Sequence, residues 1–311
     1  MISLRYHVVS VTAVFLALAV GVVLGSTAIS GRLLSGLTDD NSELGREVAA
    51  LRADRVALDA RLAEADRFAG AVGPSAVREQ LADRTVVLVT TADAAPGDRD
   101  ALVELLRAAG ADVTGEVQLT ESFTDPDKAD QLLNMVARLQ PAGTQLPTGA
   151  DPGTRAGALL GSVLLLGGDG RPRATEAESA AALGGLAGAG FVRQKAPVRP
   201  AQLAVVLTGG AASGNSAGDR AAVVARFASQ LDRSGAGAVL AGDRGSADGT
   251  GAVGVVRADT AATSVLSTVD HLDTAAGRVV TVLALREQLE GGAGRYGVAG
   301  NAEGAAPGIP D

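Results

Sequence analysis

An uncharged, mostly apolar segment near the amino terminus places the strongest constraint on how this chain folds. No charged residue occurs from Val8 to Leu24, and the uncharged stretch continues as far as Gly31. A helix of roughly 20 such residues spans a hydrocarbon core of ~30 Å. We therefore predict that residues 1–31 contain a membrane-spanning anchor, with Val8, Phe15 and Leu24 among its residues.

The alternative for this segment is a cleaved signal peptide, for which Val23-Leu24-Gly25 is a passable cleavage site. The apolar run is longer than the ~7–15-residue core of a signal peptide, which favours an uncleaved anchor. The free amino terminus and Arg5 precede the run, whereas Arg32, followed by Asp39 and Asp40, comes after it, and the positive-inside rule then places the amino terminus in the cytoplasm. No other apolar run is comparable in length, so we expect a single-pass protein in the cell membrane whose main domain lies outside the cytoplasm.

Heptad spacing follows the apolar segment over residues 32–72 and predicts a coiled-coil stalk. Leucines occupy the d positions and a mixed set occupies the a positions: Leu37, Leu44, Leu51 and Leu58 at d, and Asn41, Val48, Arg55 and Leu62 at a. Leucine at d with a polar Asn41 at a favours a parallel homodimer, because buried amides pair only when they are aligned. The alternative is an amphipathic helix packed on its own domain.

One residue of the stalk disfavours pairing. Arg55 weakens the apolar core and requires a nearby carboxylate, for which Asp54 and Asp59 are candidates. The helix is expected to end between Phe68 and Gly73, where an Ala-Gly-Ala-Val-Gly-Pro sequence interrupts the pattern.

Residues 73–290 alternate short Val- and Leu-rich runs with helical periodicity, which predicts an α/β domain with a mostly parallel, Rossmann- or flavodoxin-like sheet. Strands are expected at Thr85–Thr90, Val113–Leu119, Val163–Leu166, Leu203–Leu207, Ala238–Ala241 and Val253–Val256. Helices are expected at Asp98–Ala109, Asp127–Leu139, Gly218–Arg233 and Ala275–Glu290. The similarity of Thr85–Gly115 to Leu203–Gly242 suggests two related βαβ halves. Residues 291–311 are poor in large apolar side chains and are predicted to form a disordered tail.

Composition excludes several function classes. The chain has no Cys, which excludes disulfides, thiolate catalysis and Cys-based metal sites. Its net charge of −8 and its aromatic content of 2% disfavour nucleic acid as a partner. Only His271 could serve as the histidine of a Ser-His-acid triad in the part of the chain outside the membrane, so we predict that the protein is not an enzyme and has no catalytic residues.

Two Gly-rich turns are candidates for phosphate-binding loops. Thr208–Gly214 lies between a predicted strand and a helix but has Ala211 where a dinucleotide fingerprint has glycine. Gly167–Gly170 lacks the Lys-Ser/Thr pair of a P-loop. Both are interpreted as ordinary loops, and no cofactor is predicted from them.

The segment Asp270-His271-Leu272-Asp273 places a histidine between carboxylates. Asp270, His271 and Asp273 together are the predicted metal site, because imidazole and carboxylate groups ligate divalent metals. The alternative is a helix N-cap with solvated charges.

The amino-terminal sequence Met1-Ile-Ser-Leu-Arg-Tyr-His-Val-Val-Ser10, with the apolar stretch through Ser26, resembles that of the mycobacterial copper transport protein B (MctB) family of actinobacteria. The order of anchor, coiled coil, α/β domain and Gly-rich tail is also similar. The resemblance implies a non-catalytic cell-envelope protein in copper efflux and homeostasis, with copper as the only implied ligand. The alternative function, which the heptad stalk suggests, is a dimeric scaffold that presents the α/β domain to a cell-envelope or cell-division protein.

Overall fold

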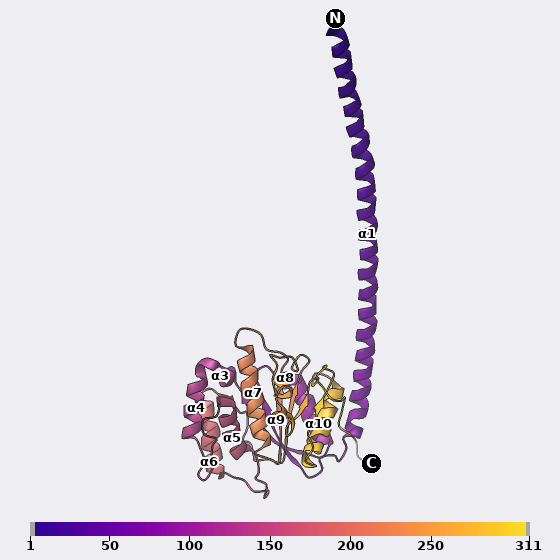
Figure 1. Ribbon diagram of the computed structural model, residues 1–311. Helices are drawn as coiled ribbons and strands as arrows, with labels where there is room; N and C mark the ends of the chain where they lie inside the picture. Colours follow the sequence, from indigo (N-terminus) through magenta and orange to yellow (C-terminus); the bar gives the residue numbers. More distant parts are fainter. Residues whose placement is uncertain (1–3, 309–311) are drawn as a thin grey trace. The chain divides into compact units, whose positions relative to one another are not determined.

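The computed structural model describes the backbone of residues 4–308, together with the side chains of residues 5–25 and 44–308. The chain divides into two compact units, residues 1–64 and residues 65–311. The described part of the first unit is helical throughout, and the second unit contains a sheet with helices on both faces (Figure 1).

Helix α1 (Leu4–Ala76) includes the predicted apolar helix: Arg5–Gly25 is long and apolar enough to cross a membrane. The predicted end of the helix between Phe68 and Gly73 is wrong, because α1 continues to Ala76. Gly73 serves packing rather than helix termination, since a Cβ at this position would lie 2.8 Å from Cγ2 of Val279 on α10 (Ala275–Leu289).

The α/β unit is built on a seven-stranded sheet in the order β3-β2-β1-β4-β5-β6-β7. All neighbouring strands are parallel except β3, which pairs antiparallel with β2. The strands are β1 (Thr85–Thr90), β2 (Asp112–Leu119), β3 (Val192–Arg193), β4 (Leu203–Thr208), β5 (Ala238–Gly242), β6 (Ser267–Val269) and β7 (Arg295–Tyr296). The prediction of an α/β fold with a mostly parallel sheet is confirmed.

Helices cover both faces of this sheet, as the fully buried central strands require. Besides α1 and α10 they are α2 (Pro96–Ala108), α3 (Glu121–Thr124), η1 (Pro126–Lys128), α4 (Ala129–Arg138), α5 (Pro152–Leu164), α6 (Glu176–Gly188), α7 (Ala217–Asp232), α8 (Ala252–Arg257) and α9 (Thr260–Thr263). Val86 and Leu88 of β1 pack in a core with α2 and α10. Val87 and Val89 point to the opposite core, which includes α5, α7 and α8.

The two predicted βαβ halves correspond to β1-α2-β2 and β4-α7-β5. They extend in opposite directions from the contact between β1 and β4, so the strand order reverses there. Their helices lie on opposite faces of the sheet. The sheet is therefore doubly wound around the contact between β1 and β4.

One predicted strand is helical in its first half and another is helical throughout. Val163 and Leu164 end α5, whose first turn is capped by the Asp151 carboxylate accepting the Thr154 N–H at 3.1 Å, whereas Leu165 and Leu166 form isolated bridges with Ala201 and Pro172. The predicted strand at Val253–Val256 lies in α8. Both runs are short and fully apolar, and such runs have no periodicity that separates a buried strand from a buried helix.

Glycines at a spacing of four residues bring α5 against α7. A Cβ at Gly157 would lie 2.8 Å from the carbonyl oxygen of Phe227, and one at Gly161 would lie 2.5 Å from Cβ of Ser234. Gly153 faces the carbonyl of Val223 in the same way. The absence of side chains along this face of α5 allows the two helix backbones to approach closely.

The expectation of a disordered tail does not hold for residues 291–308. Arg295 and Tyr296 form β7, which extends the sheet beside β6. The Glu303 carboxylate accepts the backbone N–H of Arg295 at 2.9 Å, which folds the segment back on itself. Tertiary pairing therefore orders a segment whose composition alone predicts disorder.

Candidate functional site

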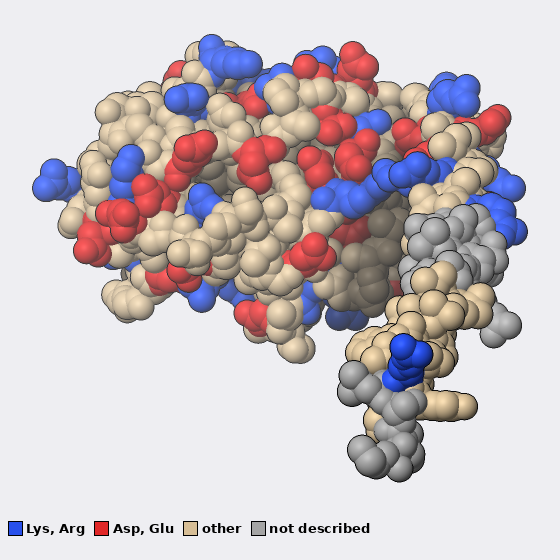
Figure 2. All heavy atoms as spheres, turned by 90° about the horizontal axis from the view of Figure 1, so that it is seen from above, with Lys and Arg blue, Asp and Glu red and all other residues tan. Residues whose placement is uncertain are grey.

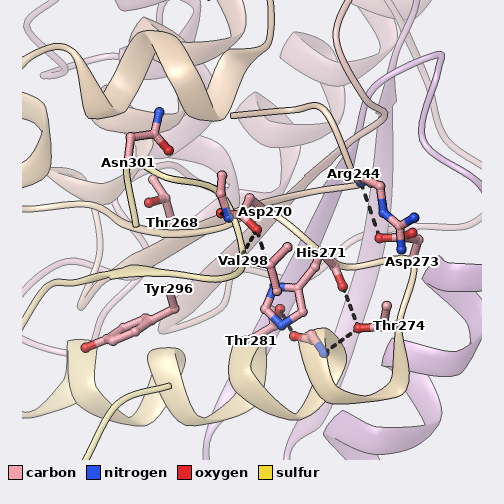
Figure 3. A network of polar contacts seen from close by, with 12 residues as sticks. Arg244, Thr268, Asp270, His271, Asp273, Thr274, Thr281, Tyr296, Val298 and Asn301 are labelled. Atoms are coloured by element: carbon pink, nitrogen blue, oxygen red, sulfur yellow. Dashed lines mark hydrogen bonds and ion pairs between the residues drawn. The ribbon is translucent and has the colours of Figure 1, made fainter. Parts of the chain in front are cut away.

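The predicted metal residues lie together where β6 leads into α10, but both carboxylates accept hydrogen bonds from the protein (Figure 3). The carboxylate of Asp270 is buried and accepts a hydrogen bond from Nη1 of Arg257 at 2.6 Å. It also accepts the backbone N–H groups of Val298 at 2.9 Å and Ala299 at 3.2 Å.

These contacts determine the charge of Asp270. Burial alone would raise the pKa of its carboxyl, but the nearby His271 ring, the Val298 N–H and the Arg257 guanidinium outweigh burial and leave the pKa below its usual range. Asp270 is therefore a permanent carboxylate neutralised by Arg257, and it ties the segment containing Val298 to the end of β6.

Asp273 has a backbone partner, whereas the His271 ring has none at Nδ1. Nδ1 of His271 is buried without a hydrogen-bond partner and lies 3.6 Å from Oδ1 of Asp270, which is longer than a hydrogen bond. Oδ1 of Asp273 accepts the backbone N–H of Arg244 at 3.3 Å. Thr274 caps the N-terminus of α10 by accepting the Gly277 N–H, so neither Asp270 nor Asp273 is the N-cap residue. Within the described residues, no group of three His, Cys, Asp or Glu side chains is placed to hold a metal ion. Metal binding by Asp270, His271 and Asp273 stays a prediction.

A second feature, a cavity of about 370 Å³, lies at the carboxyl ends of β1, β2 and β4. The strand order reverses between β1 and β4, and doubly wound sheets bind ligands at such reversals. The Gly-rich loop Thr208–Gly214 supplies one wall. Asp93, Glu121 and Arg220 supply charged groups to the other walls.

Sequence analysis missed these three charged residues because no motif connects them. Asp93 follows β1, Glu121 begins α3 after β2, and Arg220 is in the first turns of α7 after β4. The signal that could have found them is positional, since each follows the carboxyl end of a predicted parallel strand.

Acidic side chains spread over the face of the α/β unit seen in Figure 2, with Lys and Arg among them. At the carboxyl end of β5, burial and the charges of Asp98, Asp273 and Asp93 raise the pKa of Asp243 to about 6. Its Oδ1 atom is buried without a hydrogen-bond partner. Arg278 pairs with Asp98 at 2.8 Å and partly offsets this negative charge.

In the first unit, the anchor residues Val8, Phe15 and Leu24 are all exposed, as lipid-facing residues of a single helix would be. The described heptad leucines are likewise exposed: Leu44, Leu51, Leu58 and Leu62, with Val48 at 39%. The predicted positions Leu37 and Asn41 lie outside the described side chains. Of the two candidate partners of Arg55, Asp59 forms the ion pair, at 3.8 Å.

Comparisons with known proteins extend over nearly the whole chain. The family model described as "Copper transport outer membrane protein, MctB" matches residues 1–307. Proteins named "Copper transporter MctB" from Mycobacterium tuberculosis and Mycobacterium bovis are each 41% identical over 303 residues, which covers 96% of this chain and 96% of each relative. The protein of that name from Mycobacterium leprae is 39% identical over 307 residues, with the same coverage. Identity of this extent, together with an apolar amino-terminal helix joined to an α/β unit, shows that the chain belongs to the MctB family of copper transport proteins.

Proposed function

We propose that this protein acts in copper efflux as a non-catalytic, single-pass component of the cell envelope. The observation that carries the proposal is the near full-length match to proteins named copper transporters, which includes the apolar helix at Arg5–Gly25. That helix supplies membrane attachment. Copper is the transported species in this proposal and not a resident cofactor.

The test of this function is cellular copper content in a strain from which the gene has been deleted. The deletion should raise copper accumulation and copper sensitivity, and the wild-type chain should reverse both effects. A chain carrying Phe15→Arg and Leu18→Arg in the apolar segment should fail to reverse them, whereas Ala57→Arg, outside that segment, should succeed. Unchanged copper content after deletion would refute the proposal.

We also propose that two copies pair in parallel through residues 32–72. The exposed Leu44, Leu51 and Leu58 recur every seven residues, and an unpaired helix would leave all three in water. Leucine burial is worth about 1.5–3 kcal/mol per side chain, so the described part of this seam can contribute several kcal/mol to pairing. Asn41 at an a position would then set the register.

Cysteine cross-linking tests the pairing. Because the chain has no native Cys, any disulfide between two copies must form at the introduced cysteine. In membranes, Leu51→Cys at a d position should give a disulfide-linked dimer. Ala53→Cys, two residues further along on the outer face of the heptad, is the matched control and should cross-link far less. Equal cross-linking of the two variants, or none at Leu44→Cys and Leu51→Cys, would contradict a parallel coiled coil.

The same proposal includes the orientation of the protein in the membrane. The amino terminus is cytoplasmic, and the α/β unit faces a cell-envelope or cell-division partner outside the cytoplasm. Arg5 before the apolar helix supports this orientation through the positive-inside rule. Gln131→Cys, on the exposed face of α4, should react with a membrane-impermeant maleimide in intact spheroplasts. Labelling that requires permeabilised spheroplasts would reverse the orientation.

A further inference from the structure

The cavity at the carboxyl ends of β1, β2 and β4 has the position and size of a small-molecule site. Its volume of about 370 Å³ falls in the lower part of the ~300–1,000 Å³ range of ligand pockets. It lies beside the contact between β1 and β4, where the two βαβ halves diverge and leave a crevice between their loops. Neither the anchor nor the helical seam contributes a residue to it.

Close packing of the surrounding loops holds one wall of the cavity in place. A Cβ at Gly209 would lie 2.8 Å from both the carbonyl oxygen and Oδ2 of Asp93, and one at Gly210 would lie 2.7 Å from the carbonyl oxygen of Arg244. The Ala212 N–H donates to the Thr250 carbonyl at 3.2 Å. Because Gly209 and Gly210 have no Cβ, the loop after β4 can pack closely against the loops after β1 and β5.

The charged groups of the lining have both signs. Arg220 is half-buried, and its Nη2 donates to the carbonyl oxygen of Ser213 at 2.7 Å, which directs the guanidinium over the loop. Arg220 contributes one positive charge to the lining, whereas Asp93 and Glu121 contribute two carboxylates. The side chain of Thr91 donates to Oδ1 of Asp93 and orients that carboxylate.

This distribution of charge selects against some ligands. A phosphate or other simple anion would meet two carboxylates for one guanidinium. A simple amine would leave the Arg220 guanidinium without a counter-ion. A molecule with one carboxylate and two ammonium groups complements the three charges, because each charged group then meets its opposite.

We propose that this cavity binds a diamino acid, with its carboxylate on Arg220 and its ammonium groups on Asp93 and Glu121. The apolar wall formed by Val224 and Ala221 of α7 contacts the methylene chain between the charged ends. The site is independent of the copper function and of helix pairing.

Isothermal titration of the full-length protein in detergent with L-lysine tests the proposal. L-Lysine should bind, and L-lysinamide, which lacks the carboxylate, should bind about tenfold more weakly because one charge-assisted hydrogen-bonded pair is lost. Arg220→Gln should weaken L-lysine by a similar factor and remove the difference between L-lysine and L-lysinamide. Asp93→Asn should weaken both ligands.

Arg226→Gln is the matched control, because Arg226 lies on the same helix, outside the cavity, 3.9 Å from Asp151. It should bind L-lysine as the wild type does. Thermal melting of each variant separates lost binding from lost folding. The proposal is overturned by absence of L-lysine binding to folded wild type at millimolar concentration. It is equally overturned by an Arg220→Gln variant that still prefers L-lysine to L-lysinamide, or by cadaverine binding as tightly as L-lysine.

Discussion

Arg257 on α8 and Asp270 at the end of β6 form a fully buried ion pair, with 2.6 Å between Nη1 and Oδ2 and about 1% of each side chain exposed. The same guanidinium donates through Nη2 to the carbonyl oxygen of Tyr296 at 2.8 Å and through Nη1 to Oδ1 of Asn301 at 2.9 Å. The pair therefore joins α8, β6 and the carboxyl-terminal segment in one network.

Removal of one partner should destabilise the α/β unit strongly. Arg257→Met leaves the Asp270 carboxylate buried without its counter-charge, which costs about 3–5 kcal/mol in comparable pairs. Denaturant unfolding of the full-length protein should show this loss, and hydrogen exchange should increase at residues 295–304. The surface pair of Arg199 and Asp112 provides the control: Arg199→Gln should change stability by less than about 0.5 kcal/mol. Similar small effects for both variants would contradict a stabilising role of the Arg257–Asp270 ion pair.

Stability should fall as the pH rises from about 4 to above 6. Burial raises the pKa of Asp243 to about 6, and burial likewise raises that of Asp232 to about 6. Since each folded pKa is above its unfolded value of 3.8, the native state binds more protons in this window, and its stabilisation is lost as the carboxyls ionise. Asp243→Asn should flatten part of this dependence and raise the thermal midpoint near pH 7. Asp248→Asn, on the exposed loop nearby, should leave the slope unchanged.

Two Gly→Ala substitutions in helices should act in opposite directions. Gly157→Ala should destabilise the protein by about 1–3 kcal/mol, because the new Cβ would lie 2.8 Å from the Phe227 carbonyl oxygen and force α5 away from α7. A Cβ at Gly184 in α6 has no neighbour within 4 Å, so Gly184→Ala should stabilise by about 0.5–1 kcal/mol through helix propensity. Thermal or denaturant unfolding measures both, and stabilisation by Gly157→Ala would show that the close helix approach is not required.

Charge in the apolar helix should detach the protein from membranes. Each arginine at the centre of a membrane helix costs about 2.5–3.5 kcal/mol, so the Phe15→Arg and Leu18→Arg double variant should appear in the soluble fraction after alkaline carbonate extraction. Ala57→Arg should remain with the membrane pellet. Retention of the double variant would mean that attachment depends on another part of the chain.

Elements with a local pattern can be predicted from the sequence. The uncharged run from Val8 to Leu24 specifies an apolar helix, and β1, β2, β4 and β5 were recognisable as Val- and Leu-rich runs between amphipathic helices. The same reasoning failed for α5 and α8, because a short apolar run has the same pattern in a buried helix as in a buried strand.

Features that depend on partners distant in the chain cannot be predicted in this way, because they form only when the chain is folded. Part of the carboxyl-terminal segment forms β7 because it pairs with β6 and because Arg257, which is paired with Asp270, donates to the carbonyl oxygen of Tyr296. Gly73, next to a proline, lies within α1 and faces Val279, which a Cβ at this position would meet at 2.8 Å. Asp93, Glu121 and Arg220 share a cavity only because parallel strands bring their carboxyl ends to one edge and the winding reverses between β1 and β4. A sequence pattern reports the preferences of neighbouring residues, whereas long-range pairing sets which distant side chains meet.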